Sequence, residues 1–146
     1  MLDPLTLAFE AARAAADAGE VPVGAVVIRD GQTLAVAGNR PLRDRDPTAH
    51  AELLAIREAC ARLKTERLVD CDLYVTLEPC AMCAGAISLA RIRRLYFAAA
   101  DAKGGAVEHG PRFFSQPTCH HRPEVYGGLR EAEAAALLRE FFAARR

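Results

Sequence analysis

Two strand-like segments flank a short helical segment in the middle of the chain, and this arrangement constrains the fold more than any other feature. Residues 72–77 and 94–99 are apolar runs of strand length, and residues 81–90 are predicted to form a helix after the break at Pro79. A strand, a short helix and a second strand form a crossover unit, which favours parallel pairing of the two strands. The chain is therefore expected to contain a sheet that is at least partly parallel.

The remaining elements are predicted from hydrophobic periodicity and turn signals. They are a helix over 5–18, a hairpin of strands over 23–29 and 33–37, a helix over 48–64, a strand over 123–126 and a helix over 128–146. Asp30-Gly31 is a typical hairpin turn, and Thr48 is expected to cap its helix. The residues of the last helix expected to face inward are Leu129, Ala132, Ala136, Leu137 and Phe141. Together the elements predict an α/β fold with three layers, in which helices cover both faces of a mixed central sheet.

Composition excludes several classes of protein. The 146 residues are expected to form a single domain, residues 1–146, and 51% hydrophobic with 26% charged residues is globular composition. No apolar run reaches the ~18–20 residues that cross a bilayer, and residues 1–20 lack a basic leader, so we expect a cytoplasmic protein without a membrane partner. Lys and Arg total 19, as do Asp and Glu, so only a local patch could hold RNA, and no DNA partner is expected.

The cysteines point to metal chemistry. Five cysteines are an odd number in a chain large enough to fold without disulfides, which favours metal ligation or catalysis. His50, Cys80 and Cys83 offer one imidazole and two thiolates, and three protein ligands with an open fourth position are typical of catalytic zinc. Cys80 and Cys83 are three residues apart at a predicted helix start, so they can bind one ion. Pro79 suits the first position of that helix, and His50 is expected in the first turn of the preceding one.

Glu52 would complete such a site. Residues two apart do not share a helix face, so Glu52 is not expected to bind the metal together with His50. It is expected to lie beside the zinc-bound water, whose pKa zinc lowers to about 7, and to take and return its proton. Zinc and Glu52 together would suit hydrolytic attack on an electrophilic carbon.

Other interpretations of these residues remain open at this point. A Cys-x-x-Cys pair alone also occurs in redox sites and in structural zinc sites, and a histidine at a helix start is often a surface residue. The cluster Cys119-His120-His121 is a rival metal site, whereas Cys60 and Cys71 are expected to pack in the core. The fragments His50–Glu52 and Cys80–Cys83, each at a predicted helix start, indicate a catalytic zinc site only in combination.

The residues around these fragments carry a resemblance to a known family. The chain resembles the cytidine deaminase superfamily, and within it the bacterial tRNA-specific adenosine deaminases, over about residues 5–97 and again over 133–146. The matching motifs are Gly19-Glu20-Val21-Pro22-Val23-Gly24-Ala25, Asn39-Arg40-Pro41, Asp46-Pro47-Thr48-Ala49-His50-Ala51-Glu52, Leu73-Tyr74-Val75-Thr76-Leu77-Glu78-Pro79-Cys80, Ala81-Met82-Cys83, Gly85-Ala86-Ile87 and Asp101-Ala102-Lys103. The segment Gly105–Gly110 and the triplet His120-His121-Arg122 depart from the family pattern.

The resemblance implies a fold and a reaction. It implies a cytidine deaminase-like fold, one Zn²⁺ per subunit, a homodimer, and conversion of adenosine to inosine at the wobble position of a tRNA anticodon loop. It further implies that Glu52 moves the protons, that Asn39 contacts the target nucleoside and that Val21 helps to wall the pocket. Asp101 would bind the substrate, or would form a solvated turn with Lys103.

Two alternatives to this function are kept. The neutral charge and the altered 105–121 segment are compatible with a zinc-dependent deaminase of a free nucleobase or nucleoside, such as guanine, cytosine or cytidine. A non-catalytic, zinc-stabilised RNA-binding module is the other alternative, although it leaves Glu52 without a role.

Overall fold

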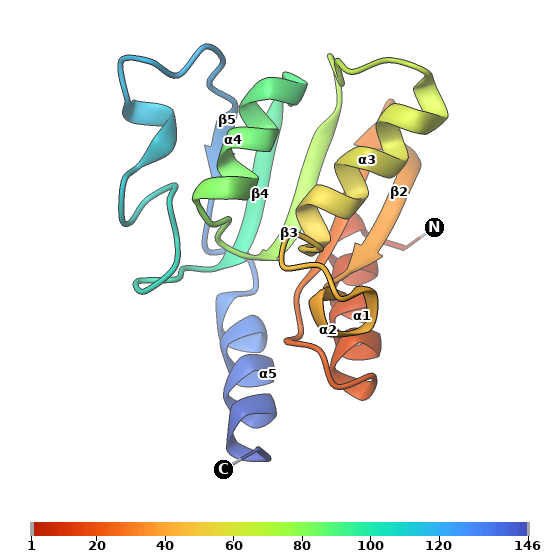
Figure 1. Ribbon diagram of the computed structural model, residues 1–146, viewed down its shortest axis with the longest axis vertical. Coiled ribbons are helices and arrows are strands. Elements are labelled where there is room, and N and C mark those ends of the chain that lie inside the picture. The colour runs from red at the N-terminus through yellow and green to blue at the C-terminus, as the bar shows by residue number, and fades with distance from the viewer. Residues whose placement is uncertain (1, 146) are drawn as a thin grey trace.

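The computed structural model describes residues 2–145, and its centre is a five-stranded mixed sheet (Figure 1). The strands lie in the order β2-β1-β3-β4-β5, and their bounds are β1 Gly24–Arg29, β2 Gln32–Gly38, β3 Asp72–Leu77, β4 Arg94–Ala99 and β5 Glu124–Tyr126. β1 pairs antiparallel with both β2 and β3, whereas β3, β4 and β5 are parallel. The predicted crossover unit and the predicted hairpin are therefore both confirmed.

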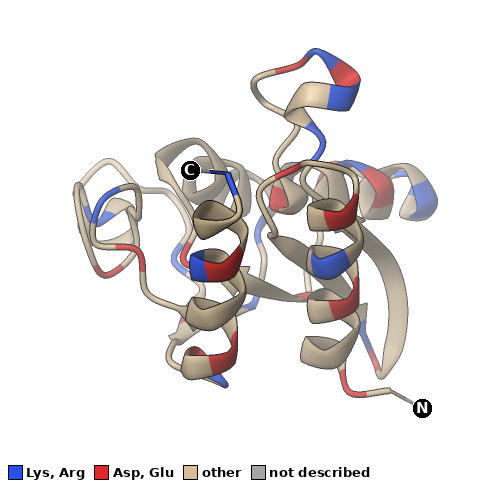
Figure 2. Ribbon diagram, turned by 90° about the horizontal axis from the view of Figure 1, so that it is seen from below, with Lys and Arg blue, Asp and Glu red and all other residues tan. Residues whose placement is uncertain are grey.

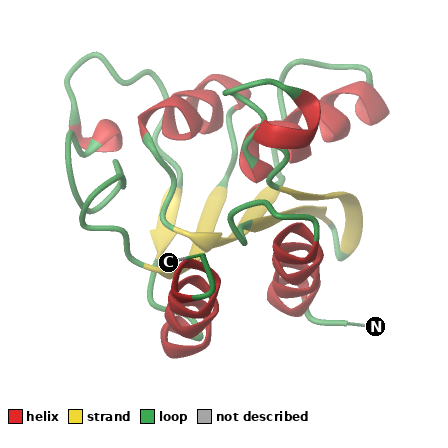
Figure 3. Ribbon diagram, turned by 60° about the horizontal axis from the view of Figure 1, so that its bottom comes forward, coloured by secondary structure: helices red, strands yellow, loops and turns green. Residues whose placement is uncertain are grey.

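Helices cover both faces of the sheet, as predicted (Figure 3). The helices are α1 Pro4–Asp17, α2 Pro41–Asp44, α3 Ala51–Leu63, α4 Ala81–Ala90 and α5 Glu131–Ala143, with a 3-10 turn at Phe113–Ser115. α3 and α4 pack on one face over alternate strand residues such as Leu73 and Val75. α1 and α5 pack on the other face, where Val26 and Tyr74 belong to a second buried cluster. This alternation is the period of two that a sheet buried on both sides requires.

The hairpin turn and the strand ends follow from local chemistry. Asp30 and Gly31 both have positive φ, at 51° and 75°, which is the type I′ geometry that Asp-Gly turns favour. α4 lies between β3 and β4, as the crossover requires, and only residues 78–80 separate the carboxyl end of β3 from the N-terminus of α4. Segments beyond the carboxyl ends of parallel strands are a common place for ligand sites.

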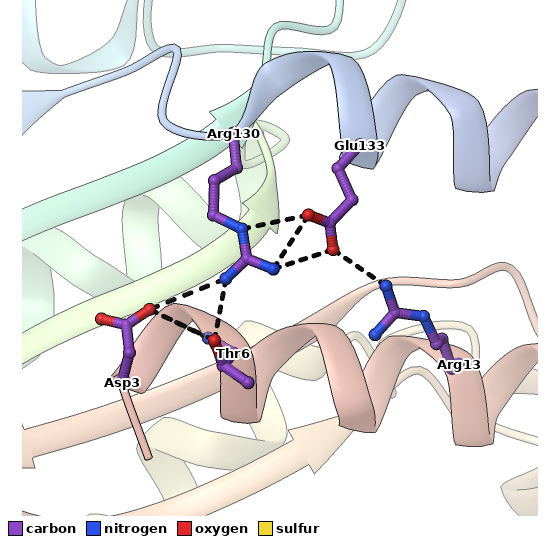
Figure 4. A network of polar contacts seen from close by, with 5 residues as sticks. All are labelled: Asp3, Thr6, Arg13, Arg130 and Glu133. Carbon is purple, nitrogen blue, oxygen red and sulfur yellow. Dashed lines mark hydrogen bonds and ion pairs between the residues drawn. The ribbon is translucent and has the colours of Figure 1, made fainter.

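A polar network joins the first and last helices (Figure 4). The Arg130 guanidinium donates to both carboxylate oxygens of Glu133 and to the Thr6 hydroxyl, and it lies 3.7 Å from the Asp3 carboxylate. Arg13 of α1 also donates to Glu133, at 2.8 Å. The network fixes α5 beside α1 across the same face of the sheet.

The predicted start of the helix over 48–64 was wrong. Thr48 does not cap α3, because its hydroxyl and its backbone N–H both donate to the Asp46 carboxylate, at 2.7 and 2.9 Å. The helix begins two residues later, with His50 as its N-cap rather than in its first turn. α4 begins at Ala81, as predicted, but its N-cap is Cys80, so Pro79 precedes the cap and does not occupy the first helical position. Two of the three expected metal ligands, His50 and Cys80, therefore occupy the N-cap positions of two helices.

The prediction for the last helix was partly wrong. α5 begins at Glu131, so Leu129 precedes it and is 39% exposed, and Ala132 is also exposed. Phe141 is buried, as predicted, and Ala134 is buried as well, because only this side of α5 meets the sheet and α1. The predicted end at Arg146 lies outside the described residues. Both signs of charge are mixed along α1 and α5 (Figure 2), and none of the helices described is long and apolar enough to span a membrane.

Candidate functional site

A small pocket opens where α3, α4 and the carboxyl end of β3 meet. Its volume is about 160 Å³. The lining residues are Val21, Val23, Asn39, His50, Glu52, Leu77, Glu78, Cys80, Asp101 and Gly104. The structure therefore brings Val21, Asn39, His50, Glu52, Cys80 and Asp101, all predicted from the sequence, to one place.

His50, Cys80 and Cys83 form a compact donor set at this pocket. Cys80 Sγ lies 3.6 Å from His50 Nδ1, and Cys83 Sγ lies 3.7 Å from the same atom. A tetrahedral zinc ion with usual Zn–S and Zn–N bonds holds such atoms roughly 3.6 Å apart. Among residues 2–145, this is the one group of histidine, cysteine and acidic side chains with the geometry to hold a metal ion. One imidazole and two sulfurs at these separations fit zinc.

The thiol chemistry of this set favours metal binding. A hydrogen bond from the Cys83 thiol, aided by the charge and hydrogen bond of His50, lowers the pKa of Cys80 to about 5. The reciprocal hydrogen bond and burial raise the pKa of Cys83 far above its ordinary value. Without a metal the pair therefore shares one negative charge, and a cation would release the second proton.

Glu52 is a buried carboxyl group in the first turn of α3. Its side chain is 4% exposed, and burial raises its pKa to about 7. A carboxyl group with a pKa near neutrality can both accept and return a proton at the pH of a cell. Glu52 and the donor set face the same pocket, so proton transfer and metal chemistry can act on one bound molecule.

Asn39, Val21 and Asp101 form the walls of the pocket. The Asn39 side chain is 9% exposed, and its Oδ1 accepts a hydrogen bond from the backbone N–H of Ala51 at 2.8 Å. This bond supplies α3 with the cap that His50 does not provide. Asp101 Oδ1 accepts from the backbone N–H groups of Lys103 and Gly104, so this carboxylate stabilises its own turn as well as lining the pocket.

A larger groove of about 1000 Å³ adjoins the pocket and shares Val21, Leu77, Asp101 and Gly104 with it. Its outer side is formed by Leu138, Phe142 and Arg145 of the α5 region. Phe142 is 47% exposed, so an aromatic ring and a guanidinium group lie beside the approach to the pocket.

Two buried glutamates around the pocket were not assigned a role from the sequence. Glu20 accepts hydrogen bonds from the backbone of Leu42 and Arg43 and from the Arg43 side chain, and so anchors the segment that follows Asn39. Glu78 is 2% exposed and binds the 101–109 loop. Burial raises the pKa of Glu78, but the hydrogen bonds from Asp101, His109 and Glu108 outweigh it and keep the pKa low. One sign of these roles is present in the sequence, which is that each glutamate stands alone beside an apolar segment.

The rival metal cluster does not form. Cys119 Sγ contacts the His121 carbonyl oxygen at 3.2 Å and the Ser88 hydroxyl at 3.5 Å. The His121 Nε2 atom hydrogen-bonds to the Ile92 carbonyl oxygen at 2.6 Å. These side chains therefore fasten the irregular 104–122 segment to α4 and to the connection between α4 and β4. Cys71 is buried and Cys60 is half-buried against the core, as expected.

Comparison with known proteins identifies the family and agrees with the fold. Residues 3–99 match the cytidine and deoxycytidylate deaminase zinc-binding region. The tRNA-specific adenosine deaminase of Agrobacterium fabrum (strain C58) is 60% identical over 142 residues, which cover 97% of this chain and 93% of that protein. The protein of the same name from Aquifex aeolicus is 47% identical over 139 residues, covering 94% and 91%.

Solved structures agree with these relatives. A structure from a study of A-to-I editing by tRNA:A34 deaminases at the wobble position of transfer RNA has a TM-score of 0.91 and 60% identity, and covers 92% of this chain and 98% of that one. A guanine deaminase from Nitrosomonas europaea has a TM-score of 0.78 and 30% identity, and covers 96% and 83%. The fold is thus shared by deaminases of RNA and of free bases, and the substrate must be argued separately.

Proposed function

Because the chain belongs to the cytidine and deoxycytidylate deaminase family of zinc-dependent enzymes, we propose that it converts adenosine to inosine at the wobble position of a tRNA anticodon. The observation that carries the proposal is the 60% identity, over nearly the whole length of both proteins, to a relative named tRNA-specific adenosine deaminase. The reaction consumes water and releases ammonia. The guanine deaminase from Nitrosomonas europaea is half as similar in sequence, which makes a free base the weaker candidate substrate.

The metal would be held by His50 Nδ1, Cys80 Sγ and Cys83 Sγ, which lie within 4.8 Å of one another. When bound, zinc supplies a Lewis acid that lowers the pKa of a coordinated water molecule toward neutrality. The chain offers this ion three donors, which leaves a fourth position for water, as in catalytic rather than structural sites. One zinc ion per subunit follows from this donor set.

Glu52 would be the catalytic residue that moves protons. Its carboxylate would accept a proton from the attacking water and donate it to the adenine ring nitrogen. It would then accept the proton of the new C6 hydroxyl group and deliver it to the amine, which leaves as ammonia as the C6 carbonyl of inosine forms. A pKa near 7 suits this exchange because neither the protonated nor the ionised form is strongly favoured at neutral pH. Burial of the side chain keeps bulk water from competing for these protons.

The walls of the pocket would orient the base. Oδ1 of Asn39 is occupied by Ala51, so its Nδ2 group is the donor that remains for the nucleoside. Val21 provides an apolar surface, and Asp101 an acceptor at the boundary between pocket and groove. In the outer groove, Phe142 and Arg145 suit a flanking unpaired nucleotide, because aromatic rings stack on bases and arginine pairs with phosphate. Such a local site agrees with the neutral overall charge.

We also propose a cytoplasmic homodimer, with residues 1–146 forming a single domain. Along α4, Ala84, Ile87 and Ala90 are buried within the chain itself and are not available to a partner subunit. Leu89, which is 73% exposed on α4, is the apolar side chain left for a partner subunit. Light scattering at micromolar concentration tests this point: a dimer is expected for the wild type and a monomer for Leu89→Glu, whereas a monomeric wild type contradicts it.

The substrate is tested by comparing ammonia release from an adenosine-containing anticodon stem-loop, guanine, cytosine and cytidine, with the zinc-loaded protein. We expect release from the stem-loop alone, with inosine appearing at the wobble position in equal amount. Turnover of a free base without turnover of RNA would reject the proposed substrate but keep the deaminase chemistry. A zinc-loaded protein inactive on every substrate would support the RNA-binding alternative.

A further inference from the structure

The carboxylate of Glu78 accepts hydrogen bonds from the 101–109 loop, which contributes Asp101 and Gly104 to the lining of the pocket. Its Oε1 accepts from the backbone N–H of Asp101 at 3.0 Å, and its Oε2 accepts from the backbone N–H groups of Val107, Glu108 and His109 at 3.1, 2.9 and 3.1 Å. The His109 ring adds a contact between its Nδ1 and Oε1 at 2.8 Å. One buried side chain therefore binds both ends of the 101–109 loop.

The loop is shaped around this carboxylate. A Cβ atom at Gly105 would lie 2.5 Å from the Glu78 carboxylate and 2.5 Å from the Asp101 carbonyl oxygen, so only glycine fits there. The Gly105 N–H donates to that carbonyl, and the Ala106 N–H donates to the Pro79 carbonyl, both at 2.9 Å. The loop thus closes onto the segment that leads into Cys80.

The same loop forms one wall of the substrate site. Asp101 and Gly104 line both the pocket and the groove, and both lie within the span that Glu78 holds. Movement of the loop would displace these two residues while leaving α3 and α4, which carry the metal donors, in place. The consequence should appear in substrate binding rather than in metal binding.

We propose that Glu78 is a positioning residue for the substrate, which holds the 101–109 loop as a preformed wall of the pocket, with His109 completing its set of hydrogen bonds. The inference rests on the proposed deaminase function and adds the residues that shape its substrate site. Glu78 also lines the pocket, but both of its carboxylate oxygens are engaged by the loop, so it acts on the substrate site by positioning the loop. Its effect is transmitted through the backbone of the loop to Asp101 and Gly104.

The His109 side chain gives the cleanest test, since its ring is 38% exposed and can be changed without opening the core. His109→Ala removes the ring donor, whereas His109→Asn places an amide N–H near the position of Nδ1. Glu78→Gln replaces one acceptor oxygen by an NH₂ group that faces backbone donors. His120→Ala, at an exposed histidine of the same irregular segment, is the matched control.

With zinc-loaded protein and the stem-loop RNA, we expect His109→Ala to raise KM roughly 10-fold with little change in kcat, and His109→Asn to restore most of the loss. Glu78→Gln should have at least the effect of His109→Ala. Zinc content should stay at the wild-type level in all three variants, and His120→Ala should match the wild type. Hydrogen exchange should quicken at the backbone amides of residues 101–109 and not in α3 or α4.

The inference is overturned if His109→Ala leaves KM and loop exchange unchanged, or if it lowers kcat and zinc content with KM unaffected. Should Glu78→Gln fail to fold, the comparison of His109→Ala with His109→Asn decides alone. If the wild type does not act on the stem-loop, the proposed function fails. Hydrogen exchange in the zinc-loaded protein still tests the role of Glu78 in that case, because it requires no substrate.

Discussion

The N-terminus of α1 and the N-termini of α3 and α4 meet the same physical requirement in different ways. Asp3 caps α1 with its own carboxylate, which accepts from the Thr6 N–H at 3.2 Å. α3 and α4 begin at His50 and Cys80, and in residues 2–145 neither side chain caps its helix. These two side chains face each other, at 3.6 Å, instead.

The N-cap residue of α1 stabilises its helix, whereas the N-cap residues of α3 and α4 are donors of the candidate metal site. A side chain that binds a metal is not available to cap its own helix, so the site gives up two caps. Asn39 compensates at α3, because its amide oxygen accepts from the Ala51 N–H at 2.8 Å. The cap of α3 is thereby supplied by a residue that also lines the pocket.

A single substitution can give α4 a capping side chain of the kind that α1 has. Cys80→Ser introduces a favoured N-cap residue but removes a metal donor. We expect zinc to be lost and inosine formation to fall by at least ~100-fold, since even outer-shell partners of a metal contribute about 10–100-fold. The zinc-free variant should be more stable than the zinc-free wild type by about 1 kcal/mol.

Metal analysis, the inosine assay and urea unfolding measure these three effects of Cys80→Ser. Cys60→Ser is the control, because Cys60 lies on the far part of α3, packed against the core and away from the pocket. Full zinc content and activity in Cys80→Ser would contradict the assignment of Cys80 as a donor.

Glu52 gives the second largest expected effect. Its folded-state pKa, raised by burial from 4.5 to about 7, means that its contribution to stability is fully present below pH 4.5 and is lost as the pH rises through 7. In zinc-free protein at pH 8, Glu52→Gln should therefore be more stable than the wild type, by up to about 3 kcal/mol. At pH 4 the two should unfold alike. Urea unfolding at pH 4 and pH 8 measures the free energy of unfolding of both proteins. A difference between the wild type and Glu52→Gln that is the same at both pH values would argue against a buried charge at Glu52.

The smallest expected effect is that of removing the cap of α1. Asp3→Ala removes the cap of α1 and should cost about 1 kcal/mol of unfolding free energy, with zinc content and activity unchanged. Asp3→Asn is the matched control, because it can still cap the helix but loses the charge that faces Arg130. Thermal unfolding at fixed zinc concentration measures the difference. A loss of activity in Asp3→Ala would show that α1 is not purely structural.

The bounds of the central strands and of the helix between them could be predicted correctly from the sequence. The ranges 72–77, 81–90 and 94–99 match β3, α4 and β4, because apolar runs there are bounded by charged residues and by Pro79. The Asp30-Gly31 turn was equally clear, since few residue pairs accept two positive φ angles. The cluster of His50, Cys80 and Cys83 was predictable because spacing and ligand chemistry agreed.

The errors lie where tertiary contacts replace local rules. Thr48 satisfies the usual capping preference, yet its hydroxyl is held by Asp46, and α3 starts at the residue that the site requires. Glu20 and Glu78 look like surface acids in sequence, but each is buried and bound by backbone N–H groups of a loop distant in the chain. Periodicity carries no information on such long-range partners.

We expect His50, Cys80 and Cys83 to hold one zinc ion. Glu52 is expected to move the protons for deamination of an anticodon adenosine. The most direct measurement compares zinc content and inosine formation in the stem-loop RNA for the wild type and Glu52→Gln. We predict one zinc ion per chain in both proteins, and inosine only with the wild type. Undiminished inosine formation by Glu52→Gln, or a wild type that binds no zinc, would contradict the account.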